Sequence, residues 1–350
     1  MNPSNLAALN PKKILFVKTH AIGDTLMATP SFAAVRRKFP NSEITLLTGT
    51  SSRGLIKDNP DLDYLLYFDE TILFQKKIFK IISTVMKIRK KKYDLAIILH
   101  YSSVMHLFAF MFRTKYRLGF TTDGTSPFLT HSYKWNLSSD VWAGDMFLKI
   151  LEYLDIHESD PTMKVAISQD DQKFAQQYFA GCQLKPSKPH IGFFPGGGKN
   201  SRDTVLAKRW PSEKYATLIN RLVEKYEANI TIFAAKNDSD VVDHVLTQVN
   251  YPVINSTGKF NLKQLTAAFN EIQLLITNDS APLHIAISQQ TPVIALFGPS
   301  NHQVLVKNNP KVYIIQSDKD CSPCYANSKF PDCEENDCMD YISVDDVMHQ

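Results

Sequence analysis

The sequence predicts an α/β protein with two halves of similar size, each built on a parallel β-sheet that helices cover on both faces. Short apolar runs of strand length alternate with segments whose apolar residues recur at helical spacing. The alternation starts near residue 13 and starts again near residue 189. A chain of 350 residues, 44% of them hydrophobic, is long enough to form two cores of ordinary size.

The first half should contain five short strands, each an apolar run bounded by polar residues or glycine. They cover residues 13–17, 43–48, 64–68, 95–99 and 117–120. A helix should follow the first strand and end at Pro40. Its apolar face is formed by Leu26, Ala33, Val35 and Phe39.

We expect an inter-domain region at residues 159–188, with prolines near both of its ends and a helix between them. The predicted domains are therefore residues 1–158 and 189–335. In the second domain, strands are predicted at 189–194, 229–234, 253–254, 274–276 and 293–296. Because strands alternate with helices in both halves, both should be Rossmann-like, and the cleft between them is the expected active site.

The bulk numbers exclude several classes of protein. A net charge of +4 is too mild to indicate nucleic-acid binding. No run of 18 or more apolar residues is present, so no membrane-spanning helix is predicted, and residues 1–13 lack a signal-peptide pattern. We therefore expect a cytoplasmic protein. Neither a Gly-x-Gly-x-x-Gly run nor a P-loop motif follows the first strand. The sequence therefore disfavours an NAD-binding protein and a P-loop nucleotide-binding protein.

Two basic segments lie in the first half. Between Lys76 and Lys92 the chain has eight Lys or Arg and no acid, interleaved at helical spacing with Ile78, Ile81, Ile82, Val85 and Ile88. Such a helix can lie on an anionic membrane surface, and it can equally be an ordinary packed helix with a solvated face. The second segment contains Arg113, Lys115 and Arg117. Either segment is a candidate for contacts to an anionic acceptor substrate.

A strand–elbow–helix pattern in the second half indicates a binding site. The apolar run 272–276 is followed by Asp279 and Ser280, and a helix opens at Ala281. An elbow of this kind directs backbone N–H groups and the positive end of a helix dipole at an anion, above all a phosphate. The next strand leads to Gly298, so a second loop reaches the same edge of the sheet. The alternative is a capped helix without a ligand.

Asp24 and His284 are the candidate titratable residues. Asp24 follows Gly23, which permits a tight turn at the carboxyl end of the first strand, and its carboxylate can act as a general base. The alternative is that Asp24 caps the following helix. His284 lies one helical turn after Ser280 and can donate a hydrogen bond to a phosphate or a sugar hydroxyl, although a lone His is more often a packing residue.

A glycine-rich loop follows the first strand of the second half. Gly196 and Gly197 allow the backbone to approach an oxyanion closely, and Lys208 supplies a point charge. Trp210, which directly follows Lys208 and Arg209, can anchor the loop that carries this lysine. We interpret the loop as a phosphate-binding segment; the alternative is an ordinary surface turn.

Four cysteines are crowded near the C-terminus in a Cys-x2-Cys-x8-Cys-x4-Cys pattern: Cys321, Cys324, Cys333 and Cys338. Three interpretations remain open, namely structural thiols or disulfides, a structural zinc or iron–sulfur site, and a redox role. The spacing differs from that of common zinc ribbons. No catalytic metal is expected.

With these residues in place, the sequence resembles the heptosyltransferases of lipopolysaccharide core synthesis, glycosyltransferase family 9. The resemblance spans nearly the whole chain, and the combination of its motifs in this order is specific. It is carried by residues 14–30, 194–197, 208–211, 277–284 and 296–300.

The resemblance implies a GT-B fold, with two Rossmann-like domains facing across a central cleft. The first domain would take the acceptor, a lipopolysaccharide core or lipid A precursor, and the second a nucleotide sugar, expected to be ADP-heptose. The reaction would be inverting and would need neither metal nor cofactor. The protein would act in the cytoplasm, peripherally on the inner face of the inner membrane. By analogy with other GT-B proteins, residues 336–350 should pack back on the first domain.

The resemblance also implies roles for individual residues. Asp24 matches the proposed general base, and Lys208 matches the lysine at the donor phosphates. The residues assigned to the donor are Gly23, Gly196, Gly197, Lys208, Asp279, Ser280, Ala281, His284 and Gly298. This sequence departs from the family pattern at Pro282, which removes a backbone donor from the elbow, and at His20-Ala21, which replace a small polar pair.

Other functions are distinguishable by experiment. A transferase of the same fold with another nucleotide sugar would bind UDP or GDP compounds. A sugar-nucleotide epimerase would convert its substrate without an acceptor. A nucleic-acid-binding protein with a Cys-ligated metal would show salt-dependent oligonucleotide binding. An inactive transferase-like protein would lack Asp24, Lys208 or His284, and all three are present.

Overall fold

The computed structural model describes residues 6–69, 71–75, 77–136, 139–159, 161–198, 205–325, 333 and 337–350. The fold is α/β, as predicted, and it divides into unit 1 (Met1–Ala166) and unit 2 (Ile167–Gln350). The boundary falls inside the predicted inter-domain region 159–188. Among the described residues, no helix is both long enough and apolar enough to span a membrane.

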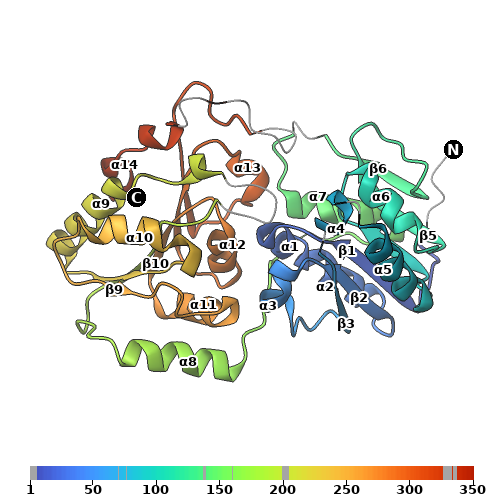
Figure 1. Cartoon of the computed structure of the whole chain (residues 1–350), viewed down its shortest axis with the longest axis horizontal. Coiled ribbons are helices and arrows are strands. Elements are labelled where there is room, and N and C mark those ends of the chain that lie inside the picture. The colour runs from blue at the N-terminus through green and yellow to red at the C-terminus, as the bar shows by residue number, and fades with distance from the viewer. Residues whose placement is uncertain are drawn as a thin grey trace. The chain divides into compact units, whose positions relative to one another are not determined.

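Unit 1 contains a six-stranded sheet whose strands are all parallel, in the order β3-β2-β1-β4-β5-β6 (Figure 1). The strands are β1 (Lys13–Lys18), β2 (Glu43–Thr48), β3 (Tyr64–Tyr67), β4 (Leu95–Ile98), β5 (Tyr116–Thr121) and β6 (His131–Lys134). The five predicted strands are present. The sixth, β6, was not predicted, because its sequence HSYK is polar and it pairs with β5 alone at the sheet edge.

The helices of unit 1 cover both faces of this sheet. They are α1 (Ile22–Met27), α2 (Thr29–Lys38), α3 (Arg53–Ile56), α4 (Thr71–Phe74), α5 (Ile78–Lys90), α6 (Ser103–Phe110) and α7 (Ala143–Lys149), with 3₁₀ turns η1 (Thr50–Ser52) and η2 (Ile150–Leu154). Alternate β1 residues point to opposite faces. Leu15 and Val17 share one core with α5 and α6, whereas Phe16 packs against Phe32 of α2 with ring centroids 4.8 Å apart.

The single helix predicted after β1 is two helices. Pro30 lies in the first turn of α2, where its missing N–H is tolerated, but a continuous helix would need that N–H to bond the carbonyl of Leu26. The Thr29 hydroxyl donates to this carbonyl instead, at 2.7 Å. Pro30 therefore accounts for the break between α1 and α2, which the spacing of the apolar residues does not reveal.

Unit 2 contains a second six-stranded parallel sheet, in the order β12-β11-β10-β7-β8-β9. The strands are β7 (His190–Phe194), β8 (Asn229–Ile232), β9 (Ile254–Asn255), β10 (Leu274–Asn278), β11 (Val293–Phe297) and β12 (Val312–Gln316). All five predicted strands are present, and β12 is the edge strand that the prediction missed. Its sequence VYIIQ is an apolar run of strand length, so this strand was overlooked although the sequence indicates it.

The helices of unit 2 are α8 (Gln169–Ala180), α9 (Ser212–Tyr226), α10 (Ser239–Leu246), α11 (Leu262–Ala268), α12 (Ala281–Ser288), α13 (His302–Leu305) and α14 (Val344–Met348). The 3₁₀ turns are η3 (Leu206–Lys208), η4 (Lys236–Asp238), η5 (Phe269–Glu271) and η6 (Cys338–Tyr341). Helix α8 fills the predicted inter-domain region and belongs to unit 2, where Tyr178 and Phe179 pack against Phe260.

The expectation for residues 336–350 needs a correction. We expected this segment to pack on the first domain, but its apolar side chains Met339, Ile342 and Val347 are buried in the core of unit 2. The indole N–H of Trp210 donates to the Ile342 carbonyl at 3.0 Å, which ties the segment to the start of α9. Burial of three apolar side chains explains why the segment stays with unit 2.

Candidate active site

Asp24 lies in the first turn of α1, beside the carboxyl end of β1. Its Oδ2 is 2.7 Å from Nζ of Lys18, the last residue of β1, and the Lys18 side chain is almost fully buried whereas that of Asp24 is one-third exposed. The N-cap of α1 is Ala21, and no side chain caps the helix, so the capping interpretation of Asp24 is wrong. The left-handed residue of the turn is also Ala21 (φ 60°) rather than Gly23.

Two histidines meet the loop that carries Asp24. The rings of His20 and His100 have centroids 4.7 Å apart, and the backbone N–H of Thr19 donates to His100 Nε2 at 3.1 Å. His100 follows β4, the strand adjacent to β1, so the sheet order brings both residues to one edge. His100 was not predicted as a site residue, because this adjacency depends on the topology of the sheet.

The strand–elbow–helix pattern in unit 2 is confirmed. Strand β10 ends at Asn278, and α12 begins at Ala281 with Ser280 as an extended N-cap residue (φ −156°, ψ 174°). The Ser280 side chain makes no capping bond, and Pro282 lies in the first turn. The N-terminal turn of α12 is therefore placed at the carboxyl edge of the sheet, where the helix dipole favours an anion.

Asp279 and Lys208 form a buried ion pair at this elbow. Lys208 Nζ donates to Asp279 Oδ2 at 2.6 Å and lies 5.6 Å from the centroid of the Tyr325 ring. Burial raises the pKa of Asp279, but the Lys208 ammonium outweighs it, and the pKa of this carboxyl lies below its usual value. Asp279 is thus a carboxylate that positions the Lys208 side chain.

We expect this ion pair to stabilise the fold in a pH-dependent way. Because the pKa of Asp279 is lowered by folding, its contribution is complete above the unfolded pKa of about 3.9 and is lost as pH falls through the lower folded value. Urea unfolding of the wild type and of Asp279→Asn should differ by a constant free energy at neutral pH, and the difference should shrink below about pH 4. A difference that grows on acidification would contradict this assignment.

A second ion pair holds the glycine loop. The guanidinium of Arg209 donates to the Gly197 carbonyl at 2.9 Å and to Asp238 Oδ1 at 2.6 Å, and Asp238 Oδ2 accepts from the Gly197 N–H at 3.2 Å. A Cβ atom on Gly196 would lie 2.6 Å from Asp238 Oδ2, and one on Gly197 (φ 94°) would lie 2.7 Å from Ser280 Cβ. Only glycine fits where this loop meets the elbow.

Asn278, which was predicted as part of the elbow but not as a site residue, connects these loops. Its buried side-chain nitrogen donates to the carbonyls of Pro195 and Gly196 at 3.0 and 3.2 Å. Its side-chain oxygen accepts from the Trp210 N–H at 3.1 Å and from the Tyr215 hydroxyl at 2.9 Å. All four hydrogen-bonding positions of the amide are therefore used. The anchoring role predicted for Trp210 agrees with its complete burial.

We expect Asn278→Ala to lower the free energy of unfolding by about 2–4 kcal/mol, because it removes four buried hydrogen bonds and leaves their partners unsatisfied. Urea denaturation measures the change. Asn250→Ala, at an exposed position with one backbone contact, is the matched control and should change stability by less than about 0.5 kcal/mol. Equal effects of the two substitutions would contradict the connecting role of Asn278.

Two further residues assigned to the donor, His284 and Gly298, are buried. His284 is buried in α12, one turn after Ser280. The Gly298 carbonyl accepts from Gln316 and Ser322, each at 2.7 Å, and a Cβ atom on Gly298 would lie 2.6 Å from Met339 Sδ. The absence of a side chain at Gly298 therefore makes room for the C-terminal segment.

The basic residues predicted to contact an acceptor lie away from Asp24. Arg113 and Lys115 directly precede β5, at the amino edge of the sheet, whereas Asp24 lies at the carboxyl edge. Arg117 is used internally, since its guanidinium donates to the carbonyls of Phe128 and Thr114, and burial lowers its pKa. The structure does not bring this segment to the candidate base.

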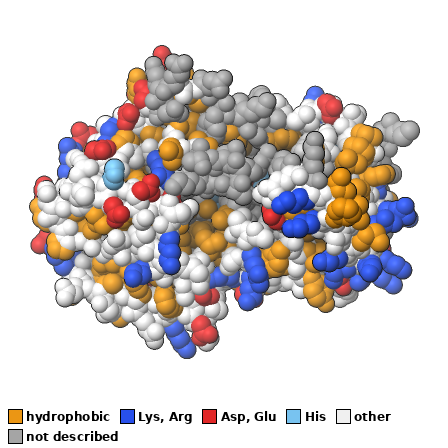
Figure 2. Space-filling view, viewed as in Figure 1, with side chains coloured by type: hydrophobic (Ala, Val, Ile, Leu, Met, Phe, Trp, Pro, Cys, Tyr) orange, Lys and Arg blue, Asp and Glu red, His pale blue; other side chains and the backbone are white. Residues whose placement is uncertain are grey.

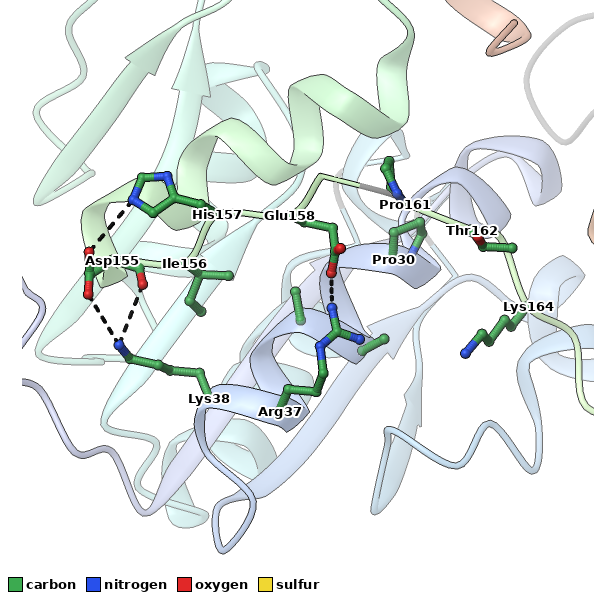
Figure 3. Close-up of a pocket in the computed structure, with 12 residues that line it drawn as sticks. Pro30, Arg37, Lys38, Asp155, Ile156, His157, Glu158, Pro161, Thr162 and Lys164 are labelled. Atoms are coloured by element: carbon green, nitrogen blue, oxygen red, sulfur yellow. Dashed lines mark hydrogen bonds and ion pairs between the residues drawn. The ribbon is translucent and has the colours of Figure 1, made fainter. Parts of the chain in front are cut away.

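A pocket of about 460 Å³ in unit 1 contains none of the predicted site residues (Figure 3). It lies between α2 and residues 155–164, and its charged side chains pair with each other. Arg37 contacts Glu158, and Lys38 Nζ is 3.4 Å from Asp155 Oδ2. These ion pairs fasten the segment after η2 to the outer side of α2, so the pocket is part of the scaffold.

The structure shows no disulfide among the cysteines that it describes. Burial is the main cause that raises the pKa of Cys338 to about 11, and the neighbouring Cys324, Cys321 and Cys333 contribute to this rise. The Cys324 N–H donates to the Pro299 carbonyl at 3.0 Å. Within the part of the chain that the structure describes, no three or more His, Cys, Asp or Glu side chains are arranged to hold a metal ion. The three interpretations of this cluster stay predictions.

Comparison with known proteins identifies what this chain resembles. A family model described as glycosyltransferase family 9 (heptosyltransferase) matches residues 81–333. The chain is 26% identical to the lipopolysaccharide core heptosyltransferase OpsX of Haemophilus influenzae over 297 residues, covering 83% of this chain and 80% of the relative. It is 24% identical to lipooligosaccharide heptosyltransferase 2 of Campylobacter jejuni over 336 residues, covering 94% and 95%.

Two solved structures share the fold. The glycosyl transferase family 9 protein from Veillonella parvula has a TM-score of 0.82 at 25% identity, covering 97% of this chain and 95% of that one. ADP-heptose lps heptosyltransferase II from E. coli has a TM-score of 0.75 at 19% identity, covering 96% of both chains. These similarities confirm the GT-B fold expected from the sequence.

Proposed function

Because the chain belongs to glycosyltransferase family 9 and is therefore a glycosyltransferase, we propose that it transfers heptose from ADP-heptose to the inner core of lipopolysaccharide. The observation that carries this proposal is the match of the family model to residues 81–333, which include the Lys208–Asp279 pair and the elbow before α12. The relatives named as heptosyltransferases support the sugar and the acceptor.

In the proposed reaction, unit 2 binds the nucleotide sugar through its diphosphate. Lys208 and the N-terminal turn of α12 supply positive charge, so the leaving diphosphate is stabilised by the protein itself. The Asp279 carboxylate keeps the Lys208 ammonium in place. Pro282 provides no N–H, so the lysine carries a larger share of this stabilisation than in an elbow without proline at this position.

Asp24 is the proposed general base. Its carboxylate accepts the proton of the acceptor hydroxyl as that oxygen attacks the anomeric carbon from the side opposite to the diphosphate. The new glycosidic bond forms as the bond to the diphosphate breaks, and the anomeric configuration is inverted. Lys18, which donates to Asp24 Oδ2, holds the carboxylate in one orientation. We propose no metal and no cofactor for this step.

A panel of nucleotides tests the donor. We expect ADP and ADP-sugars to raise the melting temperature more than UDP and GDP compounds, since a ligand at 100 times its Kd adds about 2.7 kcal/mol of stability. Stabilisation by UDP-sugars alone would contradict ADP-heptose and support another nucleotide sugar. Conversion of a nucleotide sugar without acceptor would favour the epimerase alternative. We also propose that the enzyme works in the cytoplasm at the inner membrane, where a lipid-anchored acceptor is found.

A further inference from the structure

Helix α5 has two apolar stripes, and packing uses only one of them. Ile81, Val85 and Ile88 face the sheet and belong to its core or pack against it. The second stripe points outward: Phe79 is 90% exposed, and Ile82 and Met86 are 53% and 45% exposed. The spacing of both stripes is helical. The apolar face predicted from the sequence thus combined inward and outward residues.

Helix α6 repeats this arrangement on the same face of unit 1. Its residues Met105, Phe108 and Ala109 share the core with α5, so both helices cover one face of the sheet. Its outward residues Val104, Leu107 and Phe110 are 55%, 43% and 44% exposed. Figure 2 shows apolar side chains gathered over α5 and α6, with Lys and Arg side chains near their border. We call these outward residues, with Ile78, the α5–α6 surface.

A basic pocket adjoins the C-terminal ends of both helices. It has a volume of about 330 Å³, and its charged lining comprises Arg89, Lys92, Asp94, Arg113 and Lys115. Asp94, the one acid of the lining, is engaged by the backbone, since its Oδ2 accepts from the N–H groups of Lys12 and Lys13 at 2.8 and 2.9 Å. The pocket is suited to a phosphate group.

Positive charge is concentrated on this part of the chain. Residues 71–122 contain eleven Lys or Arg and a single acid, Asp94. The other 298 residues contain 28 basic and 34 acidic residues, a net charge of −6. The small net charge of the whole protein is therefore the sum of a strongly basic segment and a slightly acidic remainder. The basic segment also exposes apolar side chains.

We propose that the α5–α6 surface and its basic pocket dock the protein on an anionic lipid bilayer, with lipid phosphates in the pocket and the outward apolar side chains inserted among the acyl chains. Apolar residues flanked by Lys and Arg are the features that bind a helix in a membrane interface. A nucleic acid would use the cations but leave Phe79 and Leu107 in water. A second copy of this surface would bring like charges together.

The position of the surface fits such a role. The basic pocket lies before β4 and β5, at the amino edge of the sheet, whereas Phe79 and Val104 are near the other ends of their helices. The apolar stripes thus extend along unit 1 toward the edge that carries Asp24. This inference deepens the proposed function, because it names the surface that meets a lipid-anchored acceptor, but lipid binding is measurable without catalysis.

Flotation with vesicles tests the proposal. The full-length protein should bind phosphatidylcholine vesicles that contain about 30% phosphatidylglycerol, should bind pure phosphatidylcholine weakly, and should dissociate as salt rises. Phe79→Ser with Leu107→Ser should lower binding at least about tenfold, and Lys92→Glu with Lys115→Glu about 25-fold or more, since each cation near the surface contributes about fivefold.

Matched controls lie in unit 2 at exposed positions: Tyr226→Ser for the apolar pair and Lys225→Glu with Lys259→Glu for the cations. These variants should bind as the wild type does. Phe79→Ser with Leu107→Ser should also keep wild-type transfer to a lipid-free acceptor, which separates docking from catalysis. Equal vesicle binding by all variants would overturn the proposal, as would binding of anionic oligonucleotides in preference to vesicles. Self-association that the same substitutions abolish, without vesicle binding, would overturn it as well.

Discussion

Replacing Asp24 by Asn is expected to lower kcat for heptosyl transfer by about 100- to 10,000-fold, which is the usual contribution of a positioned general base. Asn has the same size as Asp, and its oxygen can still accept the hydrogen bond from Lys18 at this position. The substitution therefore removes proton-accepting ability with little change in shape. Steady-state kinetics with saturating donor and acceptor measure the loss.

Donor affinity should stay unchanged in Asp24→Asn, because the proposed diphosphate contacts belong to unit 2. Isothermal titration with ADP checks this. Asp61→Asn is the matched control: Asp61 lies in a turn in which its N–H bonds Asn59 Oδ1 at 3.0 Å, and we expect full activity. An Asp24→Asn enzyme with more than about one-third of wild-type kcat would rule out the base assignment.

Replacing Lys208 by Ala is expected to lower both donor affinity and kcat/KM, the latter by about 100- to 1000-fold, the usual loss for a preorganised charge contact. The substitution should also lower the stability of the fold, because Asp279 would remain buried without its partner. Breaking a buried ion pair in this way typically costs about 3–5 kcal/mol of stability. Lower activity of Lys208→Ala alone would therefore not separate catalysis from folding.

The double variant Lys208→Met with Asp279→Asn makes that separation. It removes both charges and keeps side chains of similar size, so most of the stability should return. The rate should not return, because the positive charge at the diphosphate is still absent. Thermal melting and kinetics are measured on the same samples. A double variant that regains wild-type kcat/KM would show that Lys208 acts only through the fold.

The local features of the fold were predictable from the sequence. The elbow between β10 and α12 and ten of the strands follow from apolar runs with capping or turn residues at their ends. Strand β12 was missed although its sequence VYIIQ is an apolar run of strand length, whereas β6 was not predicted because its sequence HSYK is polar. The position of β6 thus depends on its pairing with β5 and not on its own composition.

The candidate site was predictable only in part. Asp24, Lys208 and the glycines lie in recognisable segments, but their partners come from distant parts of the chain. Lys208 meets Asp279 across 71 positions, and Arg209 meets Asp238 across 29. His100 reaches Thr19 because β4 is adjacent to β1. Such pairs are set by strand order, which a single sequence does not specify residue by residue.

Product analysis tests directly whether the protein is an inverting, metal-independent heptosyltransferase that uses ADP-heptose. The enzyme is incubated with ADP-heptose and a lipopolysaccharide inner-core acceptor, with a chelator present, and the acceptor is analysed by mass spectrometry and NMR. We expect release of ADP, an acceptor heavier by one heptosyl residue, and an anomeric configuration opposite to that of the donor. Transfer from a different nucleotide sugar only, retention of the donor configuration, or complete loss of transfer with the chelator would contradict it.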